Sequence, residues 1–216
     1  MVPLLVLFLP PRTVIPVALM VGTVLNLSIA LRERESLQAK RIVPLIVSGV
    51  FGIPLGMVLL LVLDGDVIRL IIGIVICTTG LLLMAGLYLK IKREKLALIP
   101  VGFISGILNG AISMSGPPVV LLFSNQKLRK GNFRANLVTY FIVLNILTYP
   151  IFLLGGLFTW DVLILSGVVM PGLVTGLFLG LKLTGRLDEF QFRRMALILV
   201  VVTGISALAS GLHGTL

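Results

Sequence analysis

Residues that usually carry catalysis or bind metals are scarce in this sequence. It has one cysteine, one histidine and eight acidic residues among 216. Cys77 lies inside an apolar stretch and can form no intrachain disulfide, and His213 lies near the C-terminal end. Histidine, cysteine and carboxylate residues nowhere cluster at the spacing of a metal site or a catalytic triad. The sequence therefore argues against an enzyme, and we expect no metal and no cofactor.

Charge is scarce as well, and apolar residues are abundant. Charged residues make up 12% and hydrophobic residues 58% of the chain, whose mean hydropathy is +1.17, whereas soluble domains average about 25% and about 45–50%. A helix needs about 20 mostly apolar residues to cross a bilayer. The stretches that are long enough are residues 13–31, 42–63, 67–89, 135–154, 161–181 and 195–212. We expect an all-α integral membrane protein.

The net charge of +10 predicts topology rather than a nucleic-acid partner, because the basic residues lie in short connections between apolar helices. Sixteen of the eighteen Lys and Arg residues form four clusters, at residues 32–41, 90–95, 127–134 and 182–194. The positive-inside rule places all four clusters in the cytoplasm. The connection at Asp64–Asp66 and the one at residues 155–161, which contains Trp160, then face outward, and so does the C-terminus.

One apolar segment, Leu96 to Phe123, begins at one cytoplasmic cluster and ends at the next, so it must enter the membrane and return. Asn109-Gly110 and Ser115-Gly116-Pro117-Pro118 divide it into two arms, each short for a full span. Irregular backbone inside a bilayer must be buried in protein or face water. The pattern predicts a broken, hairpin-like helix pair.

The two halves of the chain match in order. The matched pairs are Pro3 with Pro118, Asn26 with Asn145, Gly52-xxx-Gly56 with Gly172-xxx-Gly176, Arg69 with Arg193, and Thr79-Gly80 with Thr203-Gly204. Corresponding connections have opposite predicted sidedness, so we expect two inverted repeats, residues 1–90 and 91–216, in one transmembrane domain. Each repeat has a broken, re-entrant helical hairpin and three transmembrane helices. The first repeat lacks a counterpart of the arm Leu96–Ser115, so either the natural protein begins about twenty residues upstream of Met1 or half of the first hairpin is absent.

Small and neutral polar groups are the side chains that remain at membrane depth. No Asp, Glu, Lys or Arg lies in the central part of a predicted span, which argues against a carboxylate relay for protons or sodium. Where a helix restarts after Ser115, its first turn exposes unpaired N–H groups and the positive end of the helix dipole, which suit an anion. The candidate substrate-binding residues are Asn109, Ser113, Ser115, Gly116, Pro117, Pro118, Pro3, Asn26 and Asn145.

Each of these assignments has a structural alternative. The break can be a tight turn that only packs helices, and Asn26 and Asn145 can be interhelical hydrogen-bonding groups. Arg12 and Arg69, the only outward basic residues, suit interfacial anchors better than a role in attracting anions. More typical of close helix contacts than of substrate binding are the glycine pairs Gly52 and Gly56, Gly172 and Gly176, and Gly176 and Gly180.

The run GFISGILNGAISMSGPPVVLLF, residues 102–123, resembles the second-repeat signature of the sulfite exporter TauE/SafE family of membrane transporters. Residues 2–27, VPLLVLFLPPRTVIPVALMVGTVLNL, look like the corresponding first-repeat stretch. The resemblance implies a carrier of the bacterial inner membrane, whose family members export sulfite, sulfoacetate or other small sulfur-containing or organic anions. The family pattern places a glycine-rich arm before Val2-Pro3, and this chain departs from it there.

The pattern and the resemblance predict a secondary-type transporter that moves a small anion, such as sulfite, a sulfonate or a related organic anion, outward by alternating access. A membrane-embedded scaffold or assembly protein without transport activity is one alternative, and an anion channel is another. The partners we expect are the lipid bilayer and a small anionic substrate, and the sequence leaves room for a homodimer.

Overall fold

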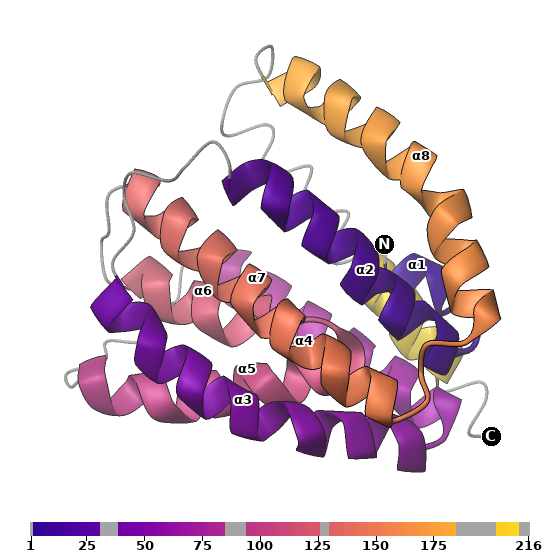
Figure 1. The fold of residues 1–216 in the computed structure, drawn as a ribbon, viewed down its shortest axis with the longest axis horizontal. Helices are drawn as coiled ribbons and strands as arrows, with labels where there is room; N and C mark the ends of the chain where they lie inside the picture. Colours follow the sequence, from indigo (N-terminus) through magenta and orange to yellow (C-terminus); the bar gives the residue numbers. More distant parts are fainter. Residues whose placement is uncertain (1, 31–38, 85–93, 126–129, 185–201, 212–216) are drawn as a thin grey trace.

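The computed structural model describes residues 2–30, 39–84, 94–125, 130–184 and 202–211, and these residues form helices and short connections without strands. The helices are α1 Val2–Leu5, α2 Pro11–Ala30, α3 Ala39–Val62, α4 Gly65–Met84, α5 Glu94–Ile112, α6 Gly116–Asn125, α7 Lys130–Leu154, α8 Trp160–Thr184 and an unlabelled helix, Val202–Gly211 (Figure 1). Five of them, α2, α3, α4, α7 and α8, are long and apolar enough to cross a membrane. The predicted all-α membrane fold is confirmed.

The helix boundaries follow the apolar stretches closely. The predicted break between the two short arms is confirmed, because α5 ends at Ile112 and α6 begins at Gly116. The predicted last span, residues 195–212, is seen as the helix Val202–Gly211, and its first part lies outside the described residues. The basic clusters fall largely on connections that lie outside the described residues too.

Apolar side chains face outward, and several polar ones face inward. Leu154 at the end of α7 is 88% exposed, and Val168 in α8 is 69% exposed. Asn109 and Thr148, by contrast, are fully buried. This distribution suits a protein surrounded by lipid, where polar groups must find partners inside the helix bundle.

Two glycine-lined helix faces bring α3 and α5 into backbone contact (Figure 1). A side chain at Gly106 would collide with the carbonyl oxygen of Gly49, and one at Gly110 would collide with that of Ile53. The two helices run parallel, because residue numbers rise together along the contact. This contact confirms the interpretation of Gly52 and Gly56, which meet the α5 backbone at Phe103–Ile107 and Ile107–Ala111.

The second glycine motif does not make such a contact among the described residues. An added Cβ at Gly172 or at Gly176 would meet no heavy atom within 4 Å. Helix α8 lies along one edge of the bundle (Figure 1), and only 11% of its span is buried. The prediction of a close helix contact here is therefore wrong for the part of the chain that the structure describes, and the surroundings of Gly180 lie outside that part.

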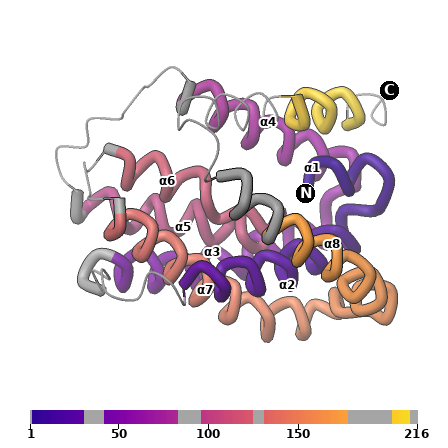
Figure 2. Tube along the Cα trace, turned by 90° about the horizontal axis from the view of Figure 1, so that it is seen from above, coloured from indigo at the N-terminus to yellow at the C-terminus, as the bar shows by residue number. Residues whose placement is uncertain are grey.

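Helix α4 packs against the helix Val202–Gly211, and the two lie side by side in Figure 2. An added Cβ at Gly73 would meet Leu208, and one at Gly204 would meet the Cys77 sulfur at 2.8 Å. The residue numbers run in opposite directions along the contact, so the two helices are antiparallel. Cys77 has a packing role at this contact.

The two arginines that the sequence predicts to face outward bind backbone carbonyls. Arg12 donates to the carbonyl of Leu60 at 3.4 Å and to that of Leu61 at 2.5 Å, at the C-terminal end of α3. A cation is stabilising at this end of a helix, where unpaired carbonyls and the negative dipole end meet. Arg69 donates to the carbonyl of Val6 at 2.8 Å and also pairs with Asp66. These contacts favour the anchoring role for both arginines.

The contact between α3 and α5 generates a stability prediction. Gly106→Val puts a branched side chain against the Gly49 carbonyl, and overpacking of this kind costs about 1–3 kcal/mol, occasionally more. Gly167→Val on α8 is the control, because an added Cβ there meets no atom within 4 Å. We expect a clearly lower thermal unfolding midpoint in detergent for Gly106→Val than for Gly167→Val. Equal midpoints would show that the close helix contact is absent.

Candidate functional site

The break between α5 and α6 begins with a residue in the left-handed region. Ser113 has φ of 51°, which is uncommon for a residue other than glycine. Its N–H donates to the Asn109 carbonyl at 2.9 Å, and the N–H of Met114 donates to the Leu108 carbonyl at 3.3 Å. The hydroxyl of Ser113 donates to the Ile15 carbonyl on α2 at 2.9 Å. The end of α5 is thereby fixed to α2.

A second set of hydrogen bonds holds the other side of the break. Tyr140 on α7 donates to the Ser105 hydroxyl at 2.8 Å, and that hydroxyl donates to the Ser115 carbonyl at 2.6 Å. The three residues that these hydrogen bonds connect are all buried. Because an unpaired carbonyl inside a bilayer costs several kcal/mol, the chain stabilises the irregular backbone at this depth.

The first turn of α6 has fewer donors than an ordinary helix start. Pro117 and Pro118 lack N–H groups, so Ser115 and Gly116 supply the backbone donors that α6 itself leaves unpaired. Among the described residues neither of these N–H groups has a partner. The Ser115 hydroxyl has none there either, although the residue is only 6% exposed. The two N–H groups, the Ser115 hydroxyl and the positive end of the α6 dipole all lie beside the same cavity.

That place is a cavity of about 200 Å³, which we call the break cavity. It lies between α2, the break and α7. Its lining residues are Ala18, Gly22, Asn26, Ser113, Met114, Ser115, Gly116, Pro117, Phe141 and Asn145. Six of the nine candidate residues, Asn26, Ser113, Ser115, Gly116, Pro117 and Asn145, are therefore brought together at one cavity.

The wall opposite the break is built by a hydrogen-bond network between α2 and α7. Asn145, 6% exposed, donates from Nδ2 to the Thr23 hydroxyl at 3.2 Å, and Tyr149 donates to the same oxygen at 3.3 Å. Thr23 in turn donates to the Leu19 carbonyl at 2.8 Å. Asn145 thus connects two helices and also lines the cavity. Asn26 lines the cavity without a side-chain partner among the described residues.

Three candidate residues lie outside the cavity lining. Asn109 is fully buried and donates from Nδ2 to the Thr148 hydroxyl at 2.7 Å, so it connects α5 to α7. Its Oδ1 atom has no partner among the described residues. Pro118 is one residue beyond the lining, and Pro3 is buried in α1. Pro3 belongs to α1, which contacts α2 and α4, and it does not line the break cavity.

The lining contains no charged side chain. What it offers is a helix N-terminus, hydroxyl and carboxamide groups, two backbone N–H groups and an aromatic edge. Such a set binds anions by dipoles and hydrogen bonds, as helix N-termini commonly do. Histidine, cysteine and carboxylates do not gather in groups of three anywhere in the described part of the chain.

A comparison with protein families gives the family of this chain. The family model of the sulfite exporter TauE/SafE matches residues 1–207. The chain belongs to the TauE/SafE family. It is accordingly a multi-pass membrane transporter, with the lipid bilayer as its surroundings and a small molecule as its substrate. No curated protein and no solved structure matches it.

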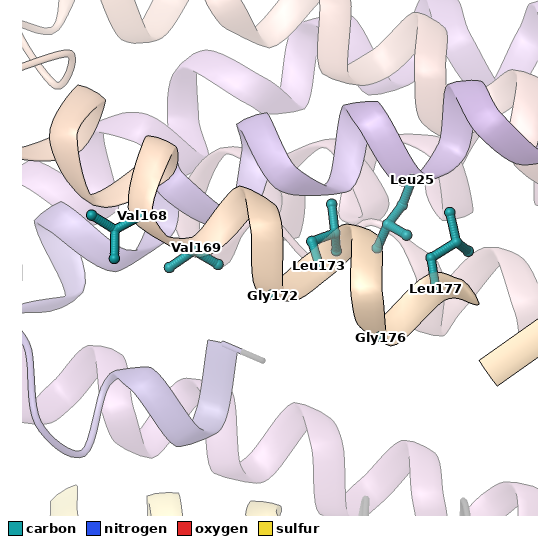
Figure 3. A pocket seen from close by; sticks show the side chains of 7 residues that line it. All are labelled: Leu25, Val168, Val169, Gly172, Leu173, Gly176 and Leu177. Atoms are coloured by element: carbon teal, nitrogen blue, oxygen red, sulfur yellow. The ribbon is translucent and has the colours of Figure 1, made fainter. Parts of the chain in front are cut away.

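A second cavity of this TauE/SafE protein differs in chemistry. It has a volume of about 580 Å³ and is lined by Leu25, Val168, Val169, Gly172, Leu173, Gly176 and Leu177. Figure 3 shows these side chains along α8 and the facing part of α2. None of them can donate a hydrogen bond, so this larger space suits acyl chains or another apolar helix rather than an anion.

Sequence reasoning missed several residues in or beside the break cavity of this TauE/SafE protein. Gly22 and Phe141 each precede a candidate asparagine by four residues, which places them on the same helix face. That spacing was the signal that could have found them. Thr23 carries no such signal, because its role depends on Asn145 and Tyr149 of a helix more than a hundred residues away.

The hydrogen-bond network on Thr23 can be tested in the purified transporter. Thr23→Val keeps the shape but removes the acceptor of both Asn145 and Tyr149, and interhelical hydrogen bonds in membranes are worth about 0.6–2 kcal/mol. Thr175→Val is a matched control, since the exposed Thr175 hydroxyl bonds only to its own helix, at 3.0 Å. We expect a lower thermal midpoint for Thr23→Val alone. The same midpoint for both variants would contradict the network.

Proposed function

We propose that the protein is a secondary carrier that moves a small oxyanion or sulfonate out of the cell by alternating access and binds it in the break cavity. The observation that carries the proposal is the convergence of the α6 N-terminus, Ser115 and the two asparagines on that cavity. Asn26 and Asn145 come from different helices, α2 and α7, yet line the same space. A turn that merely packed helices would leave no such space.

Electrostatics support an anion rather than a cation or a zwitterion. The N-terminal end of a helix carries roughly half a positive charge, and α6 directs this end at the cavity through Gly116 and Pro117. No carboxylate lines the cavity to repel an anion. In surroundings of low dielectric constant, dipoles of this kind act much more strongly than in water.

The dimensions support a small substrate. A volume of about 200 Å³ corresponds to roughly six or seven water molecules at about 30 Å³ each. Sulfite or a short sulfonate fits this space together with a few waters. The family description names sulfite export. Sulfite is small enough for the break cavity, and it is an anion, as the α6 dipole favours.

The surroundings of the cavity support alternating access. The break joins two apolar cores, because Ile112 packs in the core around α2 and α4, whereas Val119 packs in the core around α3 and α7. The predicted inverted repeats supply the motion, since rocking of one repeat against the other opens a central site to each side in turn. With the basic clusters in the cytoplasm of a bacterial cell, the C-terminus lies outside the inner membrane.

Blocking the cavity tests the proposed site. An added Cβ at Gly116 meets only the Phe141 ring, at 3.5 Å, so the larger side chain of Gly116→Leu fills the cavity. We expect this variant to lower sulfite flux at least about tenfold, which is equivalent to about 1.4 kcal/mol. Ser115→Ala removes one hydrogen-bond donor, worth about 1 kcal/mol, and is expected to raise the KM several-fold. The measurement is flux of radiolabelled sulfite from proteoliposomes with an imposed pH gradient.

Gly167→Leu on α8 is the control for both variants, because it adds a side chain far from the cavity lining. Wild-type flux in Gly116→Leu would show that the substrate does not bind in the break cavity. Flux that saturates and responds to counter-flow distinguishes a carrier from a channel, and absence of flux for every anion tested in the wild-type protein would favour a scaffold.

A further inference from the structure

Among the side chains that the structure describes, none with a full positive charge lies within reach of the break cavity. The charged ones on the surrounding helices lie near helix ends: Arg12 on α2, Asp66 and Arg69 on α4, Arg134 on α7 and Asp161 on α8. Arg12 precedes the nearest lining residue of its helix, Ala18, by about 9 Å of helix. Arg134 precedes Phe141 by about 10 Å.

The nearest of these charges are also committed elsewhere. Arg12 binds the carbonyls of Leu60 and Leu61, and Arg69 binds Val6 and Asp66. Two tyrosines lie closer, and both use their hydroxyls as hydrogen-bond donors inside the bundle: Tyr140 donates to Ser105 and Tyr149 donates to Thr23. Cys77 packs on the far side of α4, against Gly204. Among the described residues, the cavity therefore offers a substrate partial charges only.

Partial charges favour a singly charged anion. The cost of removing an ion from water grows with the square of its charge, so it is about four times larger for a dianion than for a monoanion of the same size. The attraction to the α6 dipole end, roughly half a charge, grows only in proportion to the charge. Doubling the charge of the substrate therefore raises the cost faster than the gain.

The supply of hydrogen-bond donors leads to the same preference. The prolines at 117 and 118 remove two N–H groups, and Ser113 and the Nδ2 atom of Asn145 already donate to Ile15 and Thr23. The donors left are the Ser115 hydroxyl, two backbone N–H groups, the Asn26 amide and the second Nδ2–H of Asn145. Ser115 is more than nine-tenths buried and lines the cavity with an unpartnered hydroxyl, so the site is built for a ligand but has few donors for it.

We infer that the break cavity selects singly charged oxyanions and rejects dianions, so that sulfite is carried as hydrogen sulfite. The inference rests on the proposed function and adds the charge state of the substrate. Each hydrogen sulfite ion brings its own proton across the membrane, and no carboxylate of the protein is needed for this. Export of sulfite then removes acid together with the anion.

Two permanent anions of similar head group separate the charge states. Methanesulfonate carries one charge and sulfate two throughout the neutral pH range. In proteoliposomes that contain the full chain, we expect methanesulfonate to inhibit radiolabelled sulfite flux at a concentration at least about tenfold lower than sulfate does, which corresponds to about 1.4 kcal/mol. Equal inhibition by the two anions overturns the inference and leaves the proposed function standing. If no anion moves, the proposed function fails and the inference fails with it.

The pH dependence gives an independent readout. As pH rises through the second pKa of sulfurous acid, we expect sulfite flux at fixed total sulfite to fall in parallel with the hydrogen sulfite fraction. Radiolabelled methanesulfonate is the control, and its flux is expected to stay constant because it does not titrate in this range. Sulfite flux that is constant or rises over the same range contradicts the inference.

Adding a cation to the cavity should relax the selectivity. Asn26→Lys introduces a positive charge at the lining, and Asn26→Gln is the neutral control. We expect sulfate to become a better inhibitor, relative to methanesulfonate, in Asn26→Lys but not in Asn26→Gln. An unchanged preference in folded, sulfite-transporting Asn26→Lys argues against selection by charge. If Asn26→Lys does not fold, the comparison of the two anions on the wild-type protein decides the question.

Discussion

The need to satisfy backbone polar groups inside a bilayer governs this structure, because the chain breaks a helix at membrane depth. Unpaired N–H and carbonyl groups are costly there. The protein meets this cost with the side chain of Ser105 on α5, which donates to the Ser115 carbonyl and accepts from Tyr140 on α7. The Ser113 hydroxyl in the break donates to the Ile15 carbonyl on α2. These bonds hold α2, α5 and α7 around the break. The same arrangement leaves the N–H groups of Ser115 and Gly116 beside a small polar cavity.

The rigid support of this cavity comes from the contact of α3 with α5. Glycines on both helices let the backbones touch, so the arm that leads to the break is held along much of its length. The cavity itself is then completed by two helices that are equivalent in the predicted repeat, α2 with Asn26 and α7 with Asn145. The antiparallel pairing of α4 with Val202–Gly211 is also the arrangement expected of inverted repeats. The inverted repeat stays a prediction, and it agrees with both observations.

Sequence patterns predicted the local features well and the long-range ones only in part. Apolar length and Gly-Pro punctuation located the spans and the break within a few residues, because a bilayer fixes helix length and proline fixes where hydrogen bonds are lost. Asn26 and Asn145 were found by comparing the halves, and they do meet at one cavity. Asn109 does not line the cavity, and its side chain donates to Thr148 instead. Long-range packing decides this contact, so the sequence pattern could not show it. The glycines of α8 are a second example of a long-range feature that the sequence does not predict. Their spacing predicts a helix face made of small residues, but it does not predict whether another helix packs against that face.

The central claim is that the break cavity is the anion-binding site of this TauE/SafE transporter. The most direct measurement is equilibrium binding of radiolabelled sulfite to the purified protein and to two leucine variants. Gly22→Leu projects into the cavity, where an added Cβ meets only the Asn145 Nδ2 atom at 3.8 Å, and Gly167→Leu lies on α8 away from it. The account predicts saturable binding in the wild-type protein and in Gly167→Leu, and its loss in folded Gly22→Leu. Equal binding by all three proteins would contradict it.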